Sequence, residues 1–298
     1  MSIEAKPFLK WAGGKGQLLS QLSEHLLDRI SEEPFTYIEP FVGGGAMLFY
    51  MLQHFSNIKK AIINDVNEDL ILTYRIVKDN VEALICKLDK LEKDYLGIDD
   101  QEGRSQLFYE IREQYNQHTG DSIERVTKLI FINKTCFNGL YRVNKRGMFN
   151  VPFGKYINPT ICNAEVLRAD SKLLQSAQVE ICQGDYAQTI QHIDGLTFVY
   201  LDPPYRPLDA TSSFTAYAKG DFNDDDQKKL ADFCHQLNDA GCYWMESNAD
   251  CSAKNPKDTF LEDLYANYHI ERVFASRFIN ANPSKRGKLT ELIIKNYE

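Results

Sequence analysis

The sequence predicts an α/β protein in which a mostly helical insertion interrupts the sheet-forming segments. Short apolar runs rich in β-branched and aromatic residues recur along the chain, and several end at a glycine or an acid before a helix-like segment begins. Strand–turn–helix units of this kind form sheets whose ligands lie outside the carboxyl ends of the strands. Residues 69–165 lack this alternation, since they are mostly helical and charged and then end in a basic, aromatic loop resembling a hairpin.

The individual elements follow from the local patterns. In chain order they are a strand at 36–42, a helix at 46–55, a strand from 60 that ends at 64–65, a helix to about 77, strands at 179–185 and 196–205, and strand candidates at 241–248 and 288–297. Three consecutive glycines break the first strand before its helix, and acids end the second, third and fourth runs. Chemistry is therefore expected at the strand ends.

Composition excludes several classes of protein. The 298 residues carry 34 Lys+Arg against 42 Asp+Glu, a net charge of −8, and 43% are hydrophobic, which is too apolar for a disordered chain. The longest uninterrupted apolar run, Ala46–Leu52, has seven residues, whereas a membrane-spanning helix needs ~20. The first residues lack the pattern of a secretory signal, and the seven scattered cysteines form no CxxC pair. We therefore expect a cytoplasmic protein with reduced thiols and no structural zinc.

Two basic stretches stand out in this acidic chain. Five basic residues and no acid occur between Lys134 and Tyr156, and the same is true between Arg272 and Thr290. Solvated loops would explain either stretch alone. Five aromatic residues also interleave the first one, and aromatic rings beside cations favour stacking on nucleic-acid bases.

A glycine turn follows the first predicted strand. In Glu39-Pro-Phe-Val-Gly-Gly-Gly45 the glycines let the backbone approach a ligand, and the next helix offers free N–H groups. A dinucleotide fingerprint fails because Leu48 stands where its third glycine belongs. Asp65, at the end of the next strand, is placed for a ribose hydroxyl. A simple tight turn remains an alternative at this point.

The segment Lys10–Lys15 resembles a phosphate loop only superficially, because GxxxxGK[ST] does not fit it. An ATPase is therefore a poor interpretation of this segment. Trp11, one of two tryptophans, is either a core anchor or part of a ligand site.

Asp202-Pro203-Pro204-Tyr205 is the most specific signal in the chain. Two prolines after a strand stiffen the turn and leave a carboxylate and an aromatic ring facing one cavity. Methyl transfer to an exocyclic amine needs this combination, because the lone pair of such a nitrogen is delocalised into the ring. The Asp202 carboxylate and the Pro203 carbonyl accept the two N–H hydrogens and free the lone pair, while Tyr205 stacks on the base.

With these motifs in order, the chain resembles the Dam-type (alpha group) DNA adenine-N6 methyltransferases, which recognise GATC. The resemblance runs from Phe8 to Tyr297 and rests on KWAGGK, EPFVGGGA, NDVN, NGLYRVNKRGMFNVPFGKY and FVYLDPPYRPL…FTAY. It implies a Rossmann-like S-adenosylmethionine-dependent methyltransferase sheet. Residues 1–68 and 163–298 would form the catalytic α/β domain, and 69–162 a mostly helical target-recognition domain carrying a β-hairpin.

The resemblance also implies roles for single residues. In the cofactor site, Asp65 would hold the ribose, Asp185 would lie near the adenine, and Asp202 would touch both the amino-acid end and the target amine. Trp11, Lys15, Glu39, Phe41, Gly43 and Gly45 would complete that site. The catalytic set would be Asp202, Pro203, Pro204 and Tyr205.

The DNA-binding set implied by the resemblance lies mainly in the hairpin. Phe137 would intercalate, Leu140 and Pro152 would pack on thymine, and Arg142 would read a guanine through N7 and O6. Lys10 would contact the first guanine, and Lys134, Asn138 and Asn144 would complete the set.

Some departures and alternatives remain. Residues 280–283 (Asn-Ala-Asn-Pro) replace a loop richer in serine and glycine, and the acidic run Asp224–Asp226 is expected to cap a helix beginning near Gln227 rather than to bind metal. Direct transfer needs no metal.

A cytosine-N4 methyltransferase, a release-factor or ribosomal-RNA methyltransferase, and an inactive DNA-binding protein are the competing interpretations. The expected partner is double-stranded DNA containing GATC, and a cognate restriction endonuclease would share that site without binding this chain.

Overall fold

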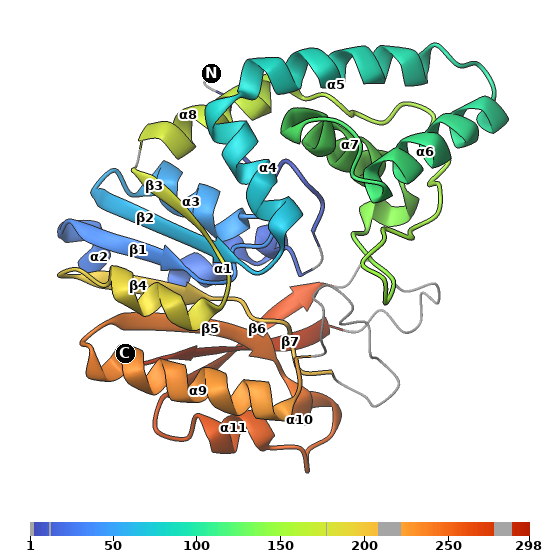
Figure 1. The fold of residues 1–298 in the computed structure, drawn as a ribbon. Coiled ribbons are helices and arrows are strands. Elements are labelled where there is room, and N and C mark those ends of the chain that lie inside the picture. Colours follow the sequence, from blue (N-terminus) through green and yellow to red (C-terminus); the bar gives the residue numbers. More distant parts are fainter. Residues whose placement is uncertain (1–2, 12, 177, 208–221, 277–287) are drawn as a thin grey trace. The chain divides into compact units, whose positions relative to one another are not determined.

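The computed structural model describes residues 3–11, 13–176, 178–207, 222–276 and 288–298 (Figure 1). It confirms the predicted α/β class, with a seven-stranded sheet and helices. Among the described residues, no helix is both long enough and apolar enough to cross a membrane. The chain folds into two compact units, and each is built from separate segments. The first unit comprises residues 1–14, 43–53 and 67–183, and the second comprises residues 15–42, 54–66 and 184–298.

The second unit contains six strands of the sheet, in the order β2-β1-β4-β5-β7-β6. They are β1 (Phe35–Glu39), β2 (Ile58–Asp65), β4 (Thr197–Leu201), β5 (Tyr243–Ala249), β6 (His269–Ser276) and β7 (Lys288–Lys295). The first four strands in this order are mutually parallel, whereas β7 runs antiparallel to both its neighbours. Every residue of β1 and β4 is buried, as is typical of central parallel strands covered on both faces.

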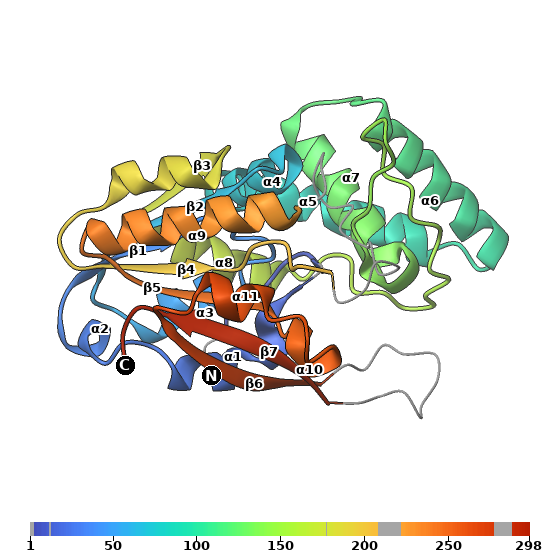
Figure 2. The same ribbon diagram turned by 90° about the horizontal axis from the view of Figure 1, so that it is seen from below.

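One long helix, α9, and several short ones belong to the second unit. They are η1 (Lys15–Gln17), α1 (Leu19–Glu24), α2 (Arg29–Glu32), η3 (Tyr186–His192), α9 (Asp224–Asp239), α10 (Cys251–Lys254) and α11 (Phe260–Leu264). The long helix α9 packs against β5 (Figure 2). It buries an apolar face that includes Leu230, Phe233 and Leu237.

The strand register brings three acids to one edge of the sheet. Glu39 on β1 pairs with Ile63 on β2, and Ile38 pairs with Val199 on β4. The carboxyl ends of these three neighbouring parallel strands therefore lie at the same edge. Asp65 ends β2, Glu39 ends β1, and Asp202 directly follows β4. This is the edge at which open α/β sheets bind ligands.

The first unit is mostly helical. Its elements are α3 (Ala46–His54), α4 (Glu68–Asp79), α5 (Val81–Leu96), α6 (Gln101–Asn116), α7 (Ser122–Thr135), η2 (Phe137–Gly139), α8 (Ala164–Ser176) and β3 (Val179–Gln183). The side chains of Asn67, Asp100 and Asp121 cap α4, α6 and α7 by accepting backbone N–H groups. Buried aromatic rings, among them Tyr95, Phe108 and Phe131, pack between these helices.

The basic aromatic segment after α7 folds back on itself. Antiparallel bridges join Cys136 to Phe153 and Val143 to Phe149. The expected hairpin is therefore present, held by isolated bridges rather than by continuous strands. Phe149 and Phe153 point inward and are buried, whereas Lys145 and Arg146 at the tip are exposed.

Several expected boundaries differ from those observed. The first strand ends at Glu39 and not at Val42, and the fourth ends at Leu201, because the prolines that follow lack the N–H a strand ladder needs. Strand β6 was not predicted, since its alternating polar and apolar residues become a strand only by pairing with β7.

The expected start of α9 near Gln227 is wrong. The helix begins at Asp224, because Asn223 and Asp226 form a reciprocal capping box. The FTAY motif (214–217) and the loop 280–283 lie outside the described residues. The division at residues 68 and 162 into catalytic and recognition domains stays a prediction.

Candidate active site

The Asp202 carboxylate is held by a buried lysine. Lys15 Nζ lies 2.7 Å from Asp202 Oδ1, and the Lys15 side chain is only 5% exposed against 20% for Asp202. The same ammonium lies 4.4 Å from the centre of the Tyr205 ring, within the range of a cation–π interaction. The turn after β4 and the start of η1 therefore enclose one cation between a carboxylate and an aromatic face.

Burial changes the charge balance of the acids at this edge. It raises the pKa of Asp202 to about 6, a shift that Lys15 opposes and the Glu291 carboxylate reinforces. Burial also raises the pKa of Glu39, and the neighbouring Asp202 charge raises it further. The Tyr37 hydroxyl, which donates to Glu39 Oε2 at 2.8 Å, lowers the same pKa and so opposes both effects. Asp202 is thus mostly a carboxylate at neutral pH, poised to accept hydrogen bonds.

Tyr205 is oriented by a strand that the motif itself does not include. Its hydroxyl donates to Glu291 Oε2 on β7 at 2.6 Å. Burial raises the pKa of Tyr205, so the phenol stays neutral and remains a donor. Nothing in the local sequence around Glu291 indicated this role.

A chain of buried amides supports the proline turn from beneath. Gln227 Nε2 donates to the Pro204 carbonyl at 3.2 Å, and Asn248 Nδ2 donates to Gln227 Oε1 at 3.0 Å and to Glu246 Oε1 at 2.9 Å. Gln227, Asn248 and Glu246 are each 0% exposed. Among the described residues, no group donates to the Pro203 carbonyl.

Sequence reasoning did not single out these supporting residues. The signal that could have found Glu246 and Asn248 is a run of polar side chains, Glu-Ser-Asn, inside an otherwise apolar strand. A buried polar group must have a partner, and such a run therefore indicates a hydrogen-bond network rather than a plain core.

Arg206 anchors the chain immediately after the tetrad. Its guanidinium contacts Asp224 at 2.7 Å at the start of α9 and Asp258 at 2.7 Å, and it lies 4.7 Å from the Phe260 ring centre. Two carboxylates and an aromatic face hold the planar group in one orientation. One end of the acidic run 224–226 thus stabilises the chain next to the turn 202–205.

The second unit also assembles the expected nucleoside-binding acids. Asn64 Nδ2 donates to the carbonyls of Pro40 and Gly184, each at 3.0 Å, and the Gly184 N–H donates to the Asp65 carbonyl at 3.2 Å. These bonds bring Asp65 and Asp185 to adjacent turns, although Asp185 Oδ1 also accepts the Ala187 N–H as the cap of η3.

Phe41 supplies an aromatic surface in the same unit. Its ring is half-buried and lies 4.9 Å from the Tyr186 ring and 6.3 Å from the Phe222 ring, centre to centre. An aromatic cluster beside two acids suits the flat adenine and the hydroxyl groups of a nucleoside.

Trp11, Gly43 and Gly45 belong to the first unit. The Trp11 indole is half-buried and stacks on Tyr141 at 4.6 Å, so it is not a core anchor. A Cβ at Gly43 would lie 3.3 Å from Trp11 Cδ1, and one at Gly45 would collide with the Tyr74 hydroxyl. Both glycines have positive φ, +48° and +77°, so the turn needs glycine for its shape as well as for space.

The hairpin presents some of the expected DNA-binding residues to solvent. Phe137 is 52% exposed, and its N–H donates to the carbonyl of exposed Pro152 at 2.9 Å. Asn138 is exposed with φ +57°, and Leu140 is half-buried. Arg142 Nε donates to Asn150 Oδ1 at 2.7 Å, which fixes the plane of the guanidinium and makes Asn150 a supporting residue that sequence reasoning missed.

Two members of the DNA-binding set differ from the exposed residues above. Asn144 Oδ1 accepts the N–H groups of Arg146 and Met148, at 2.9 and 3.2 Å, and so builds the hairpin turn. Lys134 is half-buried, and burial together with the Lys10 charge lowers its pKa to about 8. Their DNA contacts remain predictions.

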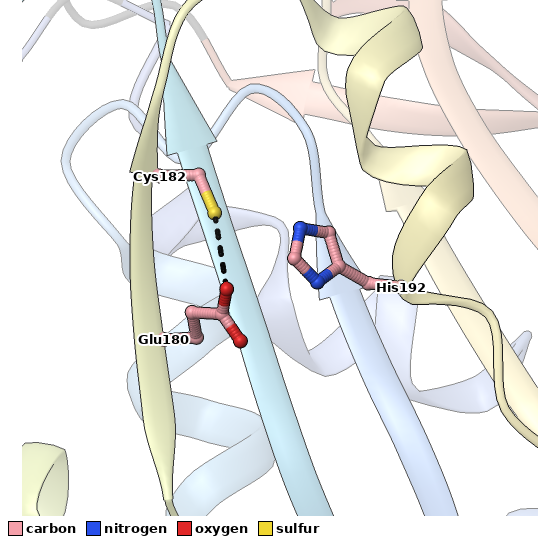
Figure 3. Close-up of side chains that lie close together, drawn as sticks. All are labelled: Glu180, Cys182 and His192. Atoms are coloured by element: carbon pink, nitrogen blue, oxygen red, sulfur yellow. Dashed lines mark hydrogen bonds between the residues drawn. The ribbon is translucent and has the colours of Figure 1, made fainter.

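Two potential metal ligands on β3 contact each other. The Cys182 thiol donates to Glu180 Oε1 at 3.9 Å (Figure 3); His192, also drawn there, belongs to the second unit. The expectation that this chain works without a metal stays a prediction.

Comparison with known proteins decides the family. A family model described as D12 class N6 adenine-specific DNA methyltransferase matches residues 11–279. The chain belongs to this family. This D12-class protein is therefore an adenine-specific DNA methyltransferase that uses S-adenosylmethionine as methyl donor and DNA as substrate.

Relatives over the full length agree with this assignment. The chain is 48% identical to the type II methyltransferase M.MjaIII of Methanocaldococcus jannaschii, covering 99% of this chain and 100% of the relative. It is 36% identical to the type II methyltransferase M1.LlaDCHI of Lactococcus lactis subsp. cremoris, covering 99% and 96%. It is 31% identical to the DNA adenine methylase of Escherichia coli K12, covering 97% and 94%.

The residues of this methyltransferase fit its cofactor. S-adenosylmethionine carries a carboxylate, an amino group, a ribose diol and an adenine. In the second unit, the Lys15 cation suits the carboxylate and the Asp202 carboxylate suits the amino group. The Asp65 carboxylate suits the ribose diol, and the Phe41 ring suits the adenine. In the first unit, the glycine turn at 43–45 offers backbone with no space for side chains beside the Trp11 indole.

Proposed function

We propose that this enzyme transfers the methyl group to N6 of adenine in GATC within double-stranded DNA, after flipping the adenine out of the duplex. The observation that carries the chemistry is the Asp202 carboxylate, fixed by Lys15 in a rigid proline turn beside the Tyr205 ring. The resemblance of the hairpin to that of Dam-type enzymes supports the site, and several relatives bear the name DNA adenine methylase.

Two acceptors at this turn suit a conjugated amine. The Asp202 carboxylate takes one N6 hydrogen, and the Pro203 carbonyl, which accepts no bond from the described residues, takes the other. Drawing both hydrogens away from the ring plane restores the nitrogen lone pair, and the carboxylate eases loss of the proton. Bound S-adenosylmethionine supplies a methyl group on a sulfonium, which needs only to be held in line with that nitrogen.

The surrounding residues position these groups. Glu291 orients Tyr205 for stacking on the flipped adenine, and Gln227 holds the Pro204 carbonyl so that the turn presents Pro203. Flipping a base costs a few kcal/mol in lost stacking and pairing. An exposed ring such as Phe137, inserted where the base was, offsets part of that cost.

Sequence recognition is assigned to the hairpin and to Lys10. Arg142 donates to Asn150 through Nε and, at 3.4 Å, through one terminal nitrogen, so that its other terminal nitrogen faces the guanine edge in this proposal. Leu140 and the exposed Pro152 supply apolar contacts for a thymine methyl, and the exposed Lys10 supplies a cation for the first guanine.

Plasmid protection tests the whole proposal. Unmethylated plasmid is incubated with the enzyme and S-adenosylmethionine, then digested with nucleases that distinguish methylated from unmethylated GATC. We expect the plasmid to be protected from the nuclease that cuts unmethylated GATC and to be cut by the nuclease that requires methylated GATC. If methyl groups enter DNA while GATC stays unprotected, the site assignment is wrong and the chemistry stands. If N4-methylcytosine is formed, the target base is wrong.

A biological role in restriction–modification is the favoured second part of the proposal, because two relatives are named type II methyltransferases. A cognate endonuclease would then cut the same sequence without binding this chain, and both would act in the cytoplasm. Co-expression with a GATC-cutting nuclease tests it: cells should survive with the active enzyme and die with Asp202→Ala. Survival with the inactive variant would contradict protection by methylation.

A further inference from the structure

Asn133 is a fully buried asparagine whose side-chain amide both accepts and donates hydrogen bonds. It lies near the end of α7 and is 0% exposed. Its Oδ1 accepts the Lys10 N–H at 2.9 Å, and its Nδ2 donates to the Lys10 carbonyl at 2.9 Å. An amide that matches both backbone groups of one residue fixes the place and the direction of that peptide.

The same amide reaches the turn that carries Phe137. Asn133 Nδ2 also donates to the Gly139 carbonyl at 3.1 Å. Gly139 has φ +64°, and a Cβ built there would lie 3.1 and 3.2 Å from Lys10 Cβ and Cγ and would collide with Cδ. Lys10 and the turn 137–139 are therefore packed directly against each other, and one buried side chain connects them. All these residues belong to the first unit.

Lys10 combines a fixed backbone with an exposed side chain. Its amino group is 5.7 Å from the centre of the Tyr156 ring, and the residue as a whole is exposed. A lysine head on a four-carbon stem selects a position only where its backbone and stem are fixed. Here Asn133 fixes the backbone, and Gly139 supplies the surface on which the stem lies.

We propose that Asn133 is a specificity-determining positioning residue, which keeps Lys10 and the turn 137–139 at one spacing against the DNA. The proposal rests on the proposed DNA contacts of Lys10 and Phe137. A hydrogen bond to a base edge weakens steeply outside about 2.7–3.2 Å. A small change in this spacing therefore costs the contact made by one element while the contacts made by the other persist.

Asn133→Asp tests the inference with little change in volume. The carboxylate still accepts the Lys10 N–H, but it loses both donated hydrogen bonds and places a charge beside two carbonyl oxygens. We expect the kcat/KM discrimination against sites altered at the base pair read by Lys10 to fall about tenfold, the order of one lost base contact. The KM for S-adenosylmethionine should be unchanged.

Asn57→Asp is the matched control. Asn57 Nδ2 also donates to two backbone carbonyls, those of Ile30 and Glu33 at 2.7 and 2.6 Å, but it lies in the second unit. This variant loses the same kind of bonds, so it should lower stability without changing sequence preference. Should Asn133→Asp fail to fold, Gly139→Ala disturbs the same junction by displacing the Lys10 stem, and it should relax the same base pair.

Lys10→Ala, measured in parallel, separates the possible failures. If Lys10→Ala relaxes discrimination at one base pair while Asn133→Asp and Gly139→Ala lower kcat/KM evenly on all sites, Asn133 is only structural and the inference is overturned. If Lys10→Ala leaves discrimination intact as well, the Lys10 contact in the proposed function is wrong, whatever the plasmid assay shows about the chemistry. Relaxation at the same base pair in all three variants supports the inference.

Discussion

The pH dependence of methyl transfer should report the ionisation of Asp202. Because its pKa is raised to about 6, only about half of the enzyme carries the carboxylate at pH 6, and about a tenth carries it at pH 5. In the proposed mechanism, transfer needs the Asp202 carboxylate as hydrogen-bond acceptor. The single-turnover rate at saturating cofactor and DNA should therefore be level above pH 7 and fall about tenfold per unit well below pH 6.

Two variants should move the acid limb of the pH–rate profile, the part in which the rate falls below pH 6, in opposite directions. Glu291→Gln removes the negative charge that raises the pKa of Asp202 and keeps an oxygen to accept the Tyr205 hydroxyl. The pKa of Asp202 should then be lower than in the unaltered enzyme, and the rate at pH 5.5 relative to that at pH 7.5 should rise. Lys15→Met removes the cation that lowers the same pKa and should move the limb upward.

Glu271→Gln on β6 is the control. Glu271 pairs with Lys295 and His25 and makes no contact with Asp202. The acid limb of the Glu271→Gln variant should therefore match that of the unaltered enzyme. Identical limbs in all four proteins would mean that a group other than Asp202 limits the rate. A shift of Glu291→Gln and Lys15→Met in the same direction would refute the electrostatic reasoning, since the two charges have opposite signs.

Four further outcomes are expected. Asp202→Ala should abolish methyl incorporation yet keep DNA binding in a gel-shift assay, because the hairpin lies elsewhere in the chain; loss of both would contradict this separation. Arg142→Ala should relax discrimination at one guanine by ~1–3 kcal/mol, as competition between singly altered sites would show, and an unchanged preference would remove its assigned role. Gln227→Leu leaves a buried carbonyl and an amide unpaired and should lower kcat about tenfold with no change in DNA Kd; equal losses in both would indicate general damage. Gly45→Ala should lower the free energy of unfolding in urea by ~1–2 kcal/mol, because alanine is strained at positive φ, and unchanged stability would mean that the turn adapts.

Much of the candidate site was predictable because its signals are local. Proline and glycine fix the backbone within a few residues, so the turns at 40–45 and 202–205 were found where the structure has them. An acid at the end of an apolar run is equally visible, and parallel strands place such acids at one edge. The DNA-contact roles of Phe137 and Pro152 came from the family resemblance and stay predictions.

Other features could not be read from local patterns. Strand β6 exists because β7 pairs with it, and α9 begins at Asp224 because Asn223 adopts a capping conformation there. The family resemblance implied that Asn144 and Lys134 contact DNA, which stays a prediction. In the fold, one builds the hairpin turn and the other is half-buried.

The α/β class, the order of the motifs, the family resemblance and the residue types available for methyl transfer all follow from periodicity and short motifs in the sequence. The side chains that hold those residues in place become visible in the folded chain: Lys15 on Asp202, Gln227 on the Pro204 carbonyl, and Asn133 on Lys10 across 123 positions. Such pairings depend on strand order, register and burial. Burial also decides whether a carboxylate keeps its ordinary pKa. These quantities are properties of the packed chain, and no short stretch of sequence contains them.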